Sequence, residues 1–131
     1  MDIFSSNKIM VLDTEYETSP KRLLAIAYLV YTCDNLTNKW IKSKSIDFIK
    51  FPKEIFKVDE SGEAFQYHKL SNSFLEENGV DIRTALENFS NALSEVDIIV
   101  GQNILTADIH IIRKEAIGVN LWFEKIRTLL K

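Results

Sequence analysis

The sequence predicts a single α/β domain in which three strands come first and a helix, a fourth strand and further helices follow. The chain has 131 residues, of which 46% are hydrophobic, so it can bury one core and is too short to suggest two. Residues up to Phe51 are rich in β-formers separated by turn residues, whereas the clearest helical periodicity begins after Val80. We therefore expect residues 1–131 to form one domain.

The first three strands are predicted from apolar runs and the turns between them. Lys8–Asp13 contains a continuous apolar run, which is typical of a buried strand. Tyr16–Arg22, with a Ser-Pro turn, interrupts this strand. Leu23–Thr32 predicts a second strand, and the polar turn Asn35–Asn38 leads to a third around Trp40–Phe51. Together they predict an antiparallel meander.

The middle of the chain predicts a long crossing segment and then one well-defined helix. Proline and glycine residues punctuate Phe51–Val80, where we expect a short helix near Asn72–Asn78. Asp81 is placed as the N-cap of the next helix. Its apolar positions recur at helical spacing and predict one core face: Ile82, Ala85, Leu86, Phe89 and Leu93.

The last third predicts a short strand and two more helices. Val96–Val100 is apolar except for one aspartate, and Gly101–Asn103 ends it in a turn. Thr106 can cap a helix that runs through Ala116 and stops at Gly118. Leu121–Leu130 is amphipathic and predicts a final helix.

Charge and composition limit the classes of function. The net charge is −3, which excludes the strongly basic surface of a dedicated nucleic-acid binder. One lysine-rich stretch, Lys39–Lys57, either follows a phosphate backbone or keeps the solvent face of a strand soluble. No signal peptide or membrane-spanning run is present, and the lone Cys33 fits a reducing compartment, so we expect a cytoplasmic location.

Two carboxylates lie at the end of the first predicted strand. Asp13 and Glu15 are two residues apart, so they share one face if the strand continues that far. Adjacent carboxylates repel each other, and a raised pKa or a bound cation relieves this repulsion. Magnesium prefers such oxygen ligands. The alternative is that the pair begins an acidic loop that continues to Glu17.

The order of several segments resembles the DnaQ-like, DEDD-type 3′-to-5′ exonucleases of the ribonuclease H-like superfamily. Val11–Glu15 resembles the first family motif, an apolar strand that ends in Asp-Thr-Glu. Tyr67–Ser71 is similar to the segment before the first long helix, and Val96–Asn103 to the strand that leads into the second motif. Asp108 resembles the metal-binding aspartate of that motif. The resemblance implies a ribonuclease H-like core over Lys8–Gly118.

The resemblance also implies an activity and a site. Asp13, Glu15 and Asp108 would be catalytic carboxylates that hold Mg²⁺ or Mn²⁺, in a family that uses two metals to displace a phosphodiester. The implied substrate is nucleic acid with a single-stranded 3′ end, either DNA or RNA. An aromatic beside the acids can stack on a terminal base or simply cover the core. The residues expected to contact substrate are Thr14, Tyr16, Gln102 and Asn103.

Three departures from the family pattern stand against this activity. Gln102 occupies a position where the family commonly has His, and the spacing from Asn103 to Asp108 is one residue longer than the common pattern. The last family motif, a His followed five residues later by Asp, does not occur; His110 and Glu115 have that spacing but belong to an earlier helix. We therefore expect the last strand and helix of the family to be absent.

Three hypotheses remain open. The first is that the chain is part of a metal-dependent exonuclease and needs a C-terminal segment or partner for full activity. The second is a catalytically degenerate domain that binds nucleic acid or protein, and the third is an unrelated small α/β interaction domain. An incomplete core would expose apolar surface near Val96–Val100 or Leu121–Leu130. That surface predicts a homodimer or a partner subunit that completes the core.

Overall fold

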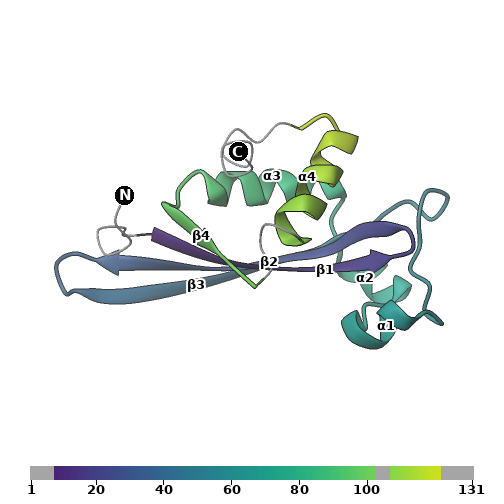
Figure 1. Cartoon of the computed structure of the whole chain (residues 1–131), viewed down its shortest axis with the longest axis horizontal. Coiled ribbons are helices and arrows are strands. Elements are labelled where there is room, and N and C mark those ends of the chain that lie inside the picture. The colour runs from purple at the N-terminus through teal and green to yellow at the C-terminus, as the bar shows by residue number, and fades with distance from the viewer. Residues whose placement is uncertain (1–7, 103–106, 122–131) are drawn as a thin grey trace.

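The computed structural model describes residues 8–102 and 107–121, which form one sheet with helices on both of its faces (Figure 1). The strands have the order β3-β2-β1-β4. The elements in chain order are β1 (Lys8–Thr18), β2 (Lys21–Asp34), β3 (Lys39–Phe48), α1 (Glu63–His68), α2 (Asn72–Asn78), α3 (Ile82–Leu93), β4 (Ile98–Val100) and α4 (Ile109–Gly118).

The sheet combines an antiparallel meander with one parallel strand. β1 pairs with β2 and β2 with β3 in antiparallel registers, which confirms the predicted meander. β4 lies parallel to β1, with Ile9 opposite Ile98 and Val11 opposite Val100. A parallel neighbour requires a crossover connection, and the segment that contains α3 provides it. Within the described residues the sheet has four strands, and the fifth strand of the ribonuclease H-like pattern is not among them.

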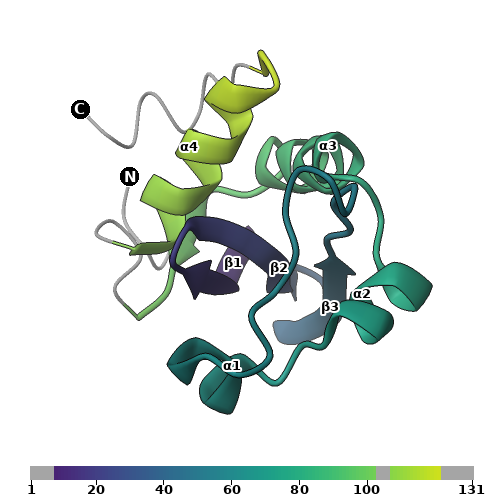
Figure 2. The same ribbon diagram turned by 90° about the vertical axis from the view of Figure 1, so that its right-hand side faces the viewer.

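Helices cover the two faces of the sheet unequally. α3 and α4 lie together on one face, whereas α1 and α2 lie on the other side, near the turn that joins β1 to β2 (Figures 1 and 2). The larger core lies between the sheet and the α3–α4 layer, and its largest fully buried side chains include Met10, Leu12, Ile26, Leu86, Phe89 and Ile112. A smaller core beneath α2 consists of Leu24, Phe56, Val58 and Leu75.

The strands differ from their predicted bounds because pairing extends or shortens them. The predicted interruption over Tyr16–Arg22 is too long: β1 continues to Thr18 and β2 begins at Lys21, although the predicted Ser-Pro turn lies between them at Ser19 and Pro20. Ladder bonds between the two strands keep this polar sequence extended. The third strand ends at Phe48 rather than Phe51, and Ile49 then bridges to Val80 beside α2.

The helix predictions were more accurate where capping residues set the ends. α2 spans the predicted residues, and Asp81 caps α3, because its carboxylate accepts the Thr84 backbone N–H at 3.0 Å. α1 was not predicted. α4 includes Gly118, which was expected to stop it, and Thr106 and residues 122–130 lie outside the described residues. None of the described helices has the length and apolar content to cross a membrane.

Candidate active site

Alternation along β1 brings two acidic side chains to one face of the sheet. Leu12 and Thr14 are buried, whereas Asp13 and Glu15 are exposed, as expected for a strand whose residues alternate between faces. Because β1 continues through these residues, the condition for the two carboxylates to share a face is met. A register irregularity against β2 follows directly after Glu15. The predicted acidic pair therefore belongs to a strand and not to a loop.

Asp108 lies at the start of α4, yet its side chain serves β1 rather than the helix. It directly precedes Ile109, has helical backbone angles like Ala107 before it, and makes no side-chain capping hydrogen bond. Its Oδ1 instead accepts the Thr14 hydroxyl at 2.5 Å, and the residue is only 4% exposed. Thr14 lies between Asp13 and Glu15 in the sequence. This hydrogen bond therefore attaches the third acidic residue to the stretch of β1 that carries the other two.

The three carboxyl groups influence one another electrostatically. Burial, and then the charge of Asp13, raises the pKa of Asp108, while its hydrogen bonds with Thr14 act in the opposite direction. Burial also raises the pKa of Glu15, and the charges of Asp13 and Asp108 add to this, whereas His68 opposes it. Crowded negative charge of this kind is what a bound cation relieves.

The donor set fits a hard divalent cation, but the arrangement is not a formed metal site. All three groups offer carboxylate oxygens, which Mg²⁺ and Mn²⁺ prefer. In the described part of the chain, no three or more His, Cys, Asp or Glu side chains are gathered closely enough to hold a metal. The Thr14 hydroxyl occupies one oxygen of Asp108, so this carboxylate would have to serve both the hydroxyl and a metal, or turn between them.

A buried Glu–His pair fastens α1 beside the candidate site. Glu17 is 4% exposed; its Oε2 accepts the Asp59 backbone N–H at 3.0 Å, and its Oε1 lies 3.3 Å from Nε2 of His68. Nδ1 of His68 accepts the Leu70 backbone N–H at 2.9 Å. Nε2 must therefore carry the proton that it donates to Glu17. Both ring nitrogens of His68 are therefore engaged, one with β1 and one with the backbone that follows α1.

The other predicted contact residues are only partly described. Thr14 is buried, and its hydroxyl serves Asp108. Tyr16 is half-buried against the core, with the Lys21 ammonium 5.1 Å from the centre of its ring. Gln102 is exposed in the turn after β4, and Asn103 lies outside the described residues.

Sequence reasoning missed a further buried carboxylate, Glu115 on α4. It is 5% exposed and receives three hydrogen bonds: two from the Arg22 guanidinium, at 2.9 and 3.1 Å, and one from the Leu23 backbone N–H at 2.9 Å. A signal was available, because Glu115 occupies a helical position among the apolar residues that face the core: Ile111, Ile112 and Ala116. A charge on that face requires a partner.

The comparisons with known proteins identify the fold. No family model matches the chain, and no curated protein matches it. A product-bound exonuclease I has a TM-score of 0.74 at 11% identity, and the match covers 93% of this chain and 28% of that one. The fold is the ribonuclease H-like fold of these exonucleases. The predicted fold class is thus confirmed.

Two further solved structures support the same fold. A structure described as SSB/exonuclease I in complex with the inhibitor CFAM has a TM-score of 0.74 at 12% identity, over 93% of this chain and 26% of that one. Exonuclease I from Methylocaldum szegediense has a TM-score of 0.62 at 16% identity, over 80% and 22%. The chain spans about a quarter of the length of these exonucleases. At such identities the likeness concerns the fold.

Proposed function

We propose that this chain is the core of a metal-dependent, DEDD-type 3′-to-5′ exonuclease domain that acts on single-stranded ends of DNA or RNA. The observation that carries the proposal is the position of Asp108, whose buried carboxylate at the start of α4 accepts a hydrogen bond from Thr14 of β1. This bond connects a third acidic residue to the stretch of β1 that carries Asp13 and Glu15. A fold shared with exonuclease I supports the same reading.

In this proposal Asp13, Glu15 and Asp108 hold Mg²⁺ or Mn²⁺, and Thr14 orients Asp108. When bound, a divalent metal would supply Lewis-acid stabilisation of the phosphate charge and a water that is more easily deprotonated. The chain's own contribution is to present two exposed carboxylates to solvent and to hold the third, buried, on the hydroxyl of Thr14. Tyr16, Gln102 and Asn103 are the proposed contacts to the terminal nucleotides.

Full activity requires a general base that the described residues do not provide. Both nitrogens of His68 are engaged in hydrogen bonds, and the side chain of His110 is exposed on α4. We infer that the base and the fourth carboxylate of the family come from a segment outside the described residues or from a partner.

The edges of the sheet are where a partner subunit or a second copy would bind. We expected exposed apolar surface near Val96–Val100. Only the end of this segment is exposed, because Val100 is 38% exposed whereas Val96 is 3% exposed. Trp40 and Ile41 of β3 are 48% and 61% exposed. An edge strand with free backbone groups and exposed apolar side chains is suited to association. The free, half-buried Cys33 is consistent with a cytoplasmic setting.

The competing proposal is a catalytically degenerate domain that keeps the fold for binding nucleic acid or protein. The absence of a formed three-ligand group among the described residues favours it, as does the bond that ties Asp108 to Thr14.

The test is hydrolysis of 5′-labelled single-stranded DNA and RNA with Mg²⁺ or Mn²⁺. The exonuclease proposal predicts progressive shortening from the 3′ end, lost in Asp13→Asn and in Asp108→Asn, and blocked by a 3′-phosphorothioate end. Oligonucleotide binding without shortening, unchanged by either substitution, would instead support the degenerate domain.

A further inference from the structure

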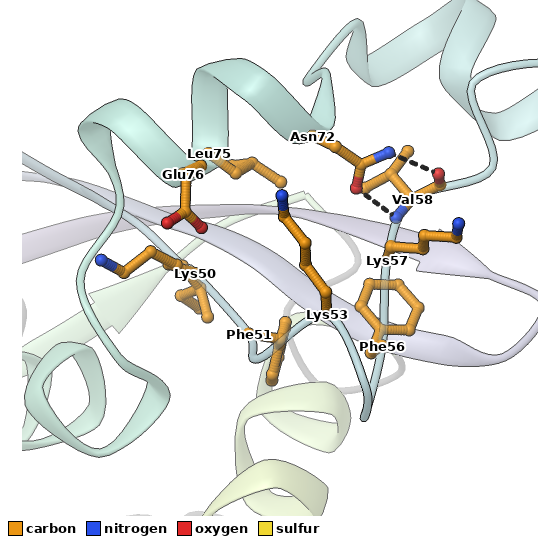
Figure 3. Close-up of a pocket in the computed structure, with 10 residues that line it drawn as sticks. Lys50, Phe51, Lys53, Phe56, Lys57, Val58, Asn72, Leu75 and Glu76 are labelled. Carbon is orange, nitrogen blue, oxygen red and sulfur yellow. Dashed lines mark hydrogen bonds between the residues drawn. The ribbon is translucent and has the colours of Figure 1, made fainter.

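The lysine-rich stretch Lys39–Lys57 is divided by the fold into two different settings. Its first lysines lie on β3, the exposed edge strand of the sheet, where they keep an open edge soluble. The later ones, Lys50, Lys53 and Lys57, follow the strand and surround a pocket between this segment and α2 (Figure 3). The two predicted alternatives for the stretch, solubility and phosphate contact, therefore apply to different parts of it.

The pocket combines an apolar floor with a cationic rim. Its volume is about 260 Å³. The floor consists of buried or half-buried apolar side chains: Ile49, Phe51, Phe56, Val58 and Leu75. Lys53 extends across the opening towards α2, and Lys50 and Lys57 stand on either side (Figure 3). Glu76 is the one acidic residue in the lining.

The walls are held in place by hydrogen bonds and ring contacts. Asn72 fastens α2 to the floor, because its Oδ1 accepts the Val58 N–H at 2.7 Å and its Nδ2 donates to the Val58 carbonyl at 2.8 Å. Phe51 and Phe56 pack edge to face with ring centres 5.3 Å apart. The Arg22 guanidinium lies 4.2 Å from the centre of the Phe51 ring. A preformed pocket binds a ligand at a lower ordering cost.

One glycine permits the close approach that forms the pocket. A Cβ at Gly79 would lie 2.4 Å from the Leu75 carbonyl oxygen and 2.9 Å from the Lys50 backbone nitrogen. Both of these atoms belong to the backbone and cannot move aside as the end of a flexible side chain could. Gly79 therefore lets the end of α2 meet the segment that carries Lys50.

The three lysines are available to an anionic ligand. Within the part of the chain that the structure describes, no ion pair or hydrogen bond is made by the ammonium groups of Lys50, Lys53 or Lys57. Elsewhere lysines are engaged: Lys114 donates to the Lys21 carbonyl. Unpaired cations above apolar and aromatic side chains match the two chemical parts of a single-stranded nucleic acid, its phosphates and its bases.

We propose that this pocket is a second contact site for single-stranded nucleic acid, with phosphates on Lys50, Lys53 and Lys57 and one base or sugar over the apolar floor. The inference rests on the proposed function. The carboxylates on β1 repel phosphate and the chain has a net charge of −3, so a bound nucleic acid needs cationic side chains elsewhere on the protein. The pocket segment is fastened to β1 through the bond from Asp59 to Glu17. A nucleic acid bound in the pocket would therefore be held next to β1, the strand that carries Asp13 and Glu15.

The test is binding of fluorescein-labelled oligo(dT) and oligo(U), measured by anisotropy at several salt concentrations in EDTA. Without metal there is neither hydrolysis nor a metal bridge, so failure of the exonuclease proposal would leave this result intact. Lys53→Ala with Lys57→Ala should weaken binding on the order of tenfold and reduce the salt slope by about 1.4, since each single-strand phosphate contact contributes about 0.7. The matched control, Lys42→Ala with Lys44→Ala on β3, has the same net charge and should bind like the wild type.

Lys53→Arg with Lys57→Arg should restore the salt slope, because arginine keeps the charge at each position. Three results would overturn the proposal: no binding by the wild type, equal losses in the pocket and β3 double variants, or displacement of the oligonucleotide by poly-glutamate at an equal concentration of charge. The last result would assign the pocket to acidic peptides.

Discussion

Two aspartates directly precede the first residue of a helix, Asp81 before α3 and Asp108 before α4, and they have opposite properties. Asp81 precedes α3, where the Thr84 N–H and hydroxyl donate to its carboxylate at 3.0 and 2.7 Å, and these bonds lower its pKa. Asp108 has helical backbone angles, makes no side-chain capping bond, and has a pKa raised by burial and by Asp13. An aspartate at a helix N-terminus is normally stabilised as the anion. Asp108 departs from that rule.

The difference separates a residue that serves the fold from one that serves a site. Asp81 satisfies backbone donors that would otherwise be left without partners at the start of α3. Burial and the charge of Asp13 raise the pKa of Asp108 and so disfavour its charged form unless a cation is bound. Strain of this kind is concentrated at functional sites. The following substitutions compare residues that stabilise the fold with Asp108.

The largest effect is expected at Glu115, which joins α4 to β2 through its bonds with Arg22 and Leu23. Glu115→Ala removes a buried carboxylate and leaves the Arg22 guanidinium and the Leu23 N–H without their partner. Breaking one side of a buried ion pair costs about 3–5 kcal/mol of unfolding free energy. Urea denaturation measures this loss. Glu87→Ala, which removes the exposed pair with Arg83, is the control and should change stability by less than about 0.5 kcal/mol. Similar losses in the two variants would show that Glu115 does not anchor the helix.

A smaller loss is expected when the α3 cap is removed. Asp81→Ala deletes the acceptor of the Thr84 N–H and should lower the free energy of unfolding by about 1 kcal/mol, a typical value for an N-cap aspartate. Thermal or urea denaturation at pH 7 measures the change. A gain in stability would contradict the assignment of Asp81 as a structural cap.

The third substitution, Asp108→Asn, has an effect of the opposite sign. Asp108→Asn keeps an acceptor for the Thr14 hydroxyl and removes the charge that burial disfavours, so at pH 7 in EDTA it should stabilise the domain by about 0.5–2 kcal/mol. A carboxyl whose folded pKa is raised contributes stability at low pH that is lost as the pH rises through that pKa. The advantage of the variant should therefore vanish below about pH 4, near the ordinary pKa of aspartate. A variant less stable than the wild type at pH 7 would assign Asp108 a structural role.

The sequence predicted elements wherever local signals determine them. The capped helices α2 and α3 and the buried start of β1 were recovered because capping residues and apolar periodicity act over a few positions. The end of β1 was missed because its polar residues stay extended only through pairing with β2. α1 was missed because it is short and has no buried residues to give it a periodic pattern.

In the candidate site too, local patterns predicted some features and missed others. Asp13 and Glu15 could be placed on one face from strand alternation alone, and Asp108 from the family resemblance. The bond from Thr14 to Asp108 spans 94 positions, and those from Arg22 and Leu23 to Glu115 span 93 and 92. Partners so far apart are brought together by the packing of α4 on the sheet, which no local pattern encodes.

The most direct test of the account is calorimetric titration of Mg²⁺ and Mn²⁺ into the wild type, the Asp13→Ala, Asp108→Ala double variant and Asp81→Ala. If Asp108 is kept beside β1 for a metal, the wild type and Asp81→Ala should bind the ion, and the double variant should not bind it while remaining folded. Absence of binding in the wild type, or binding that survives in the double variant, would contradict the assignment of these carboxylates to a metal site.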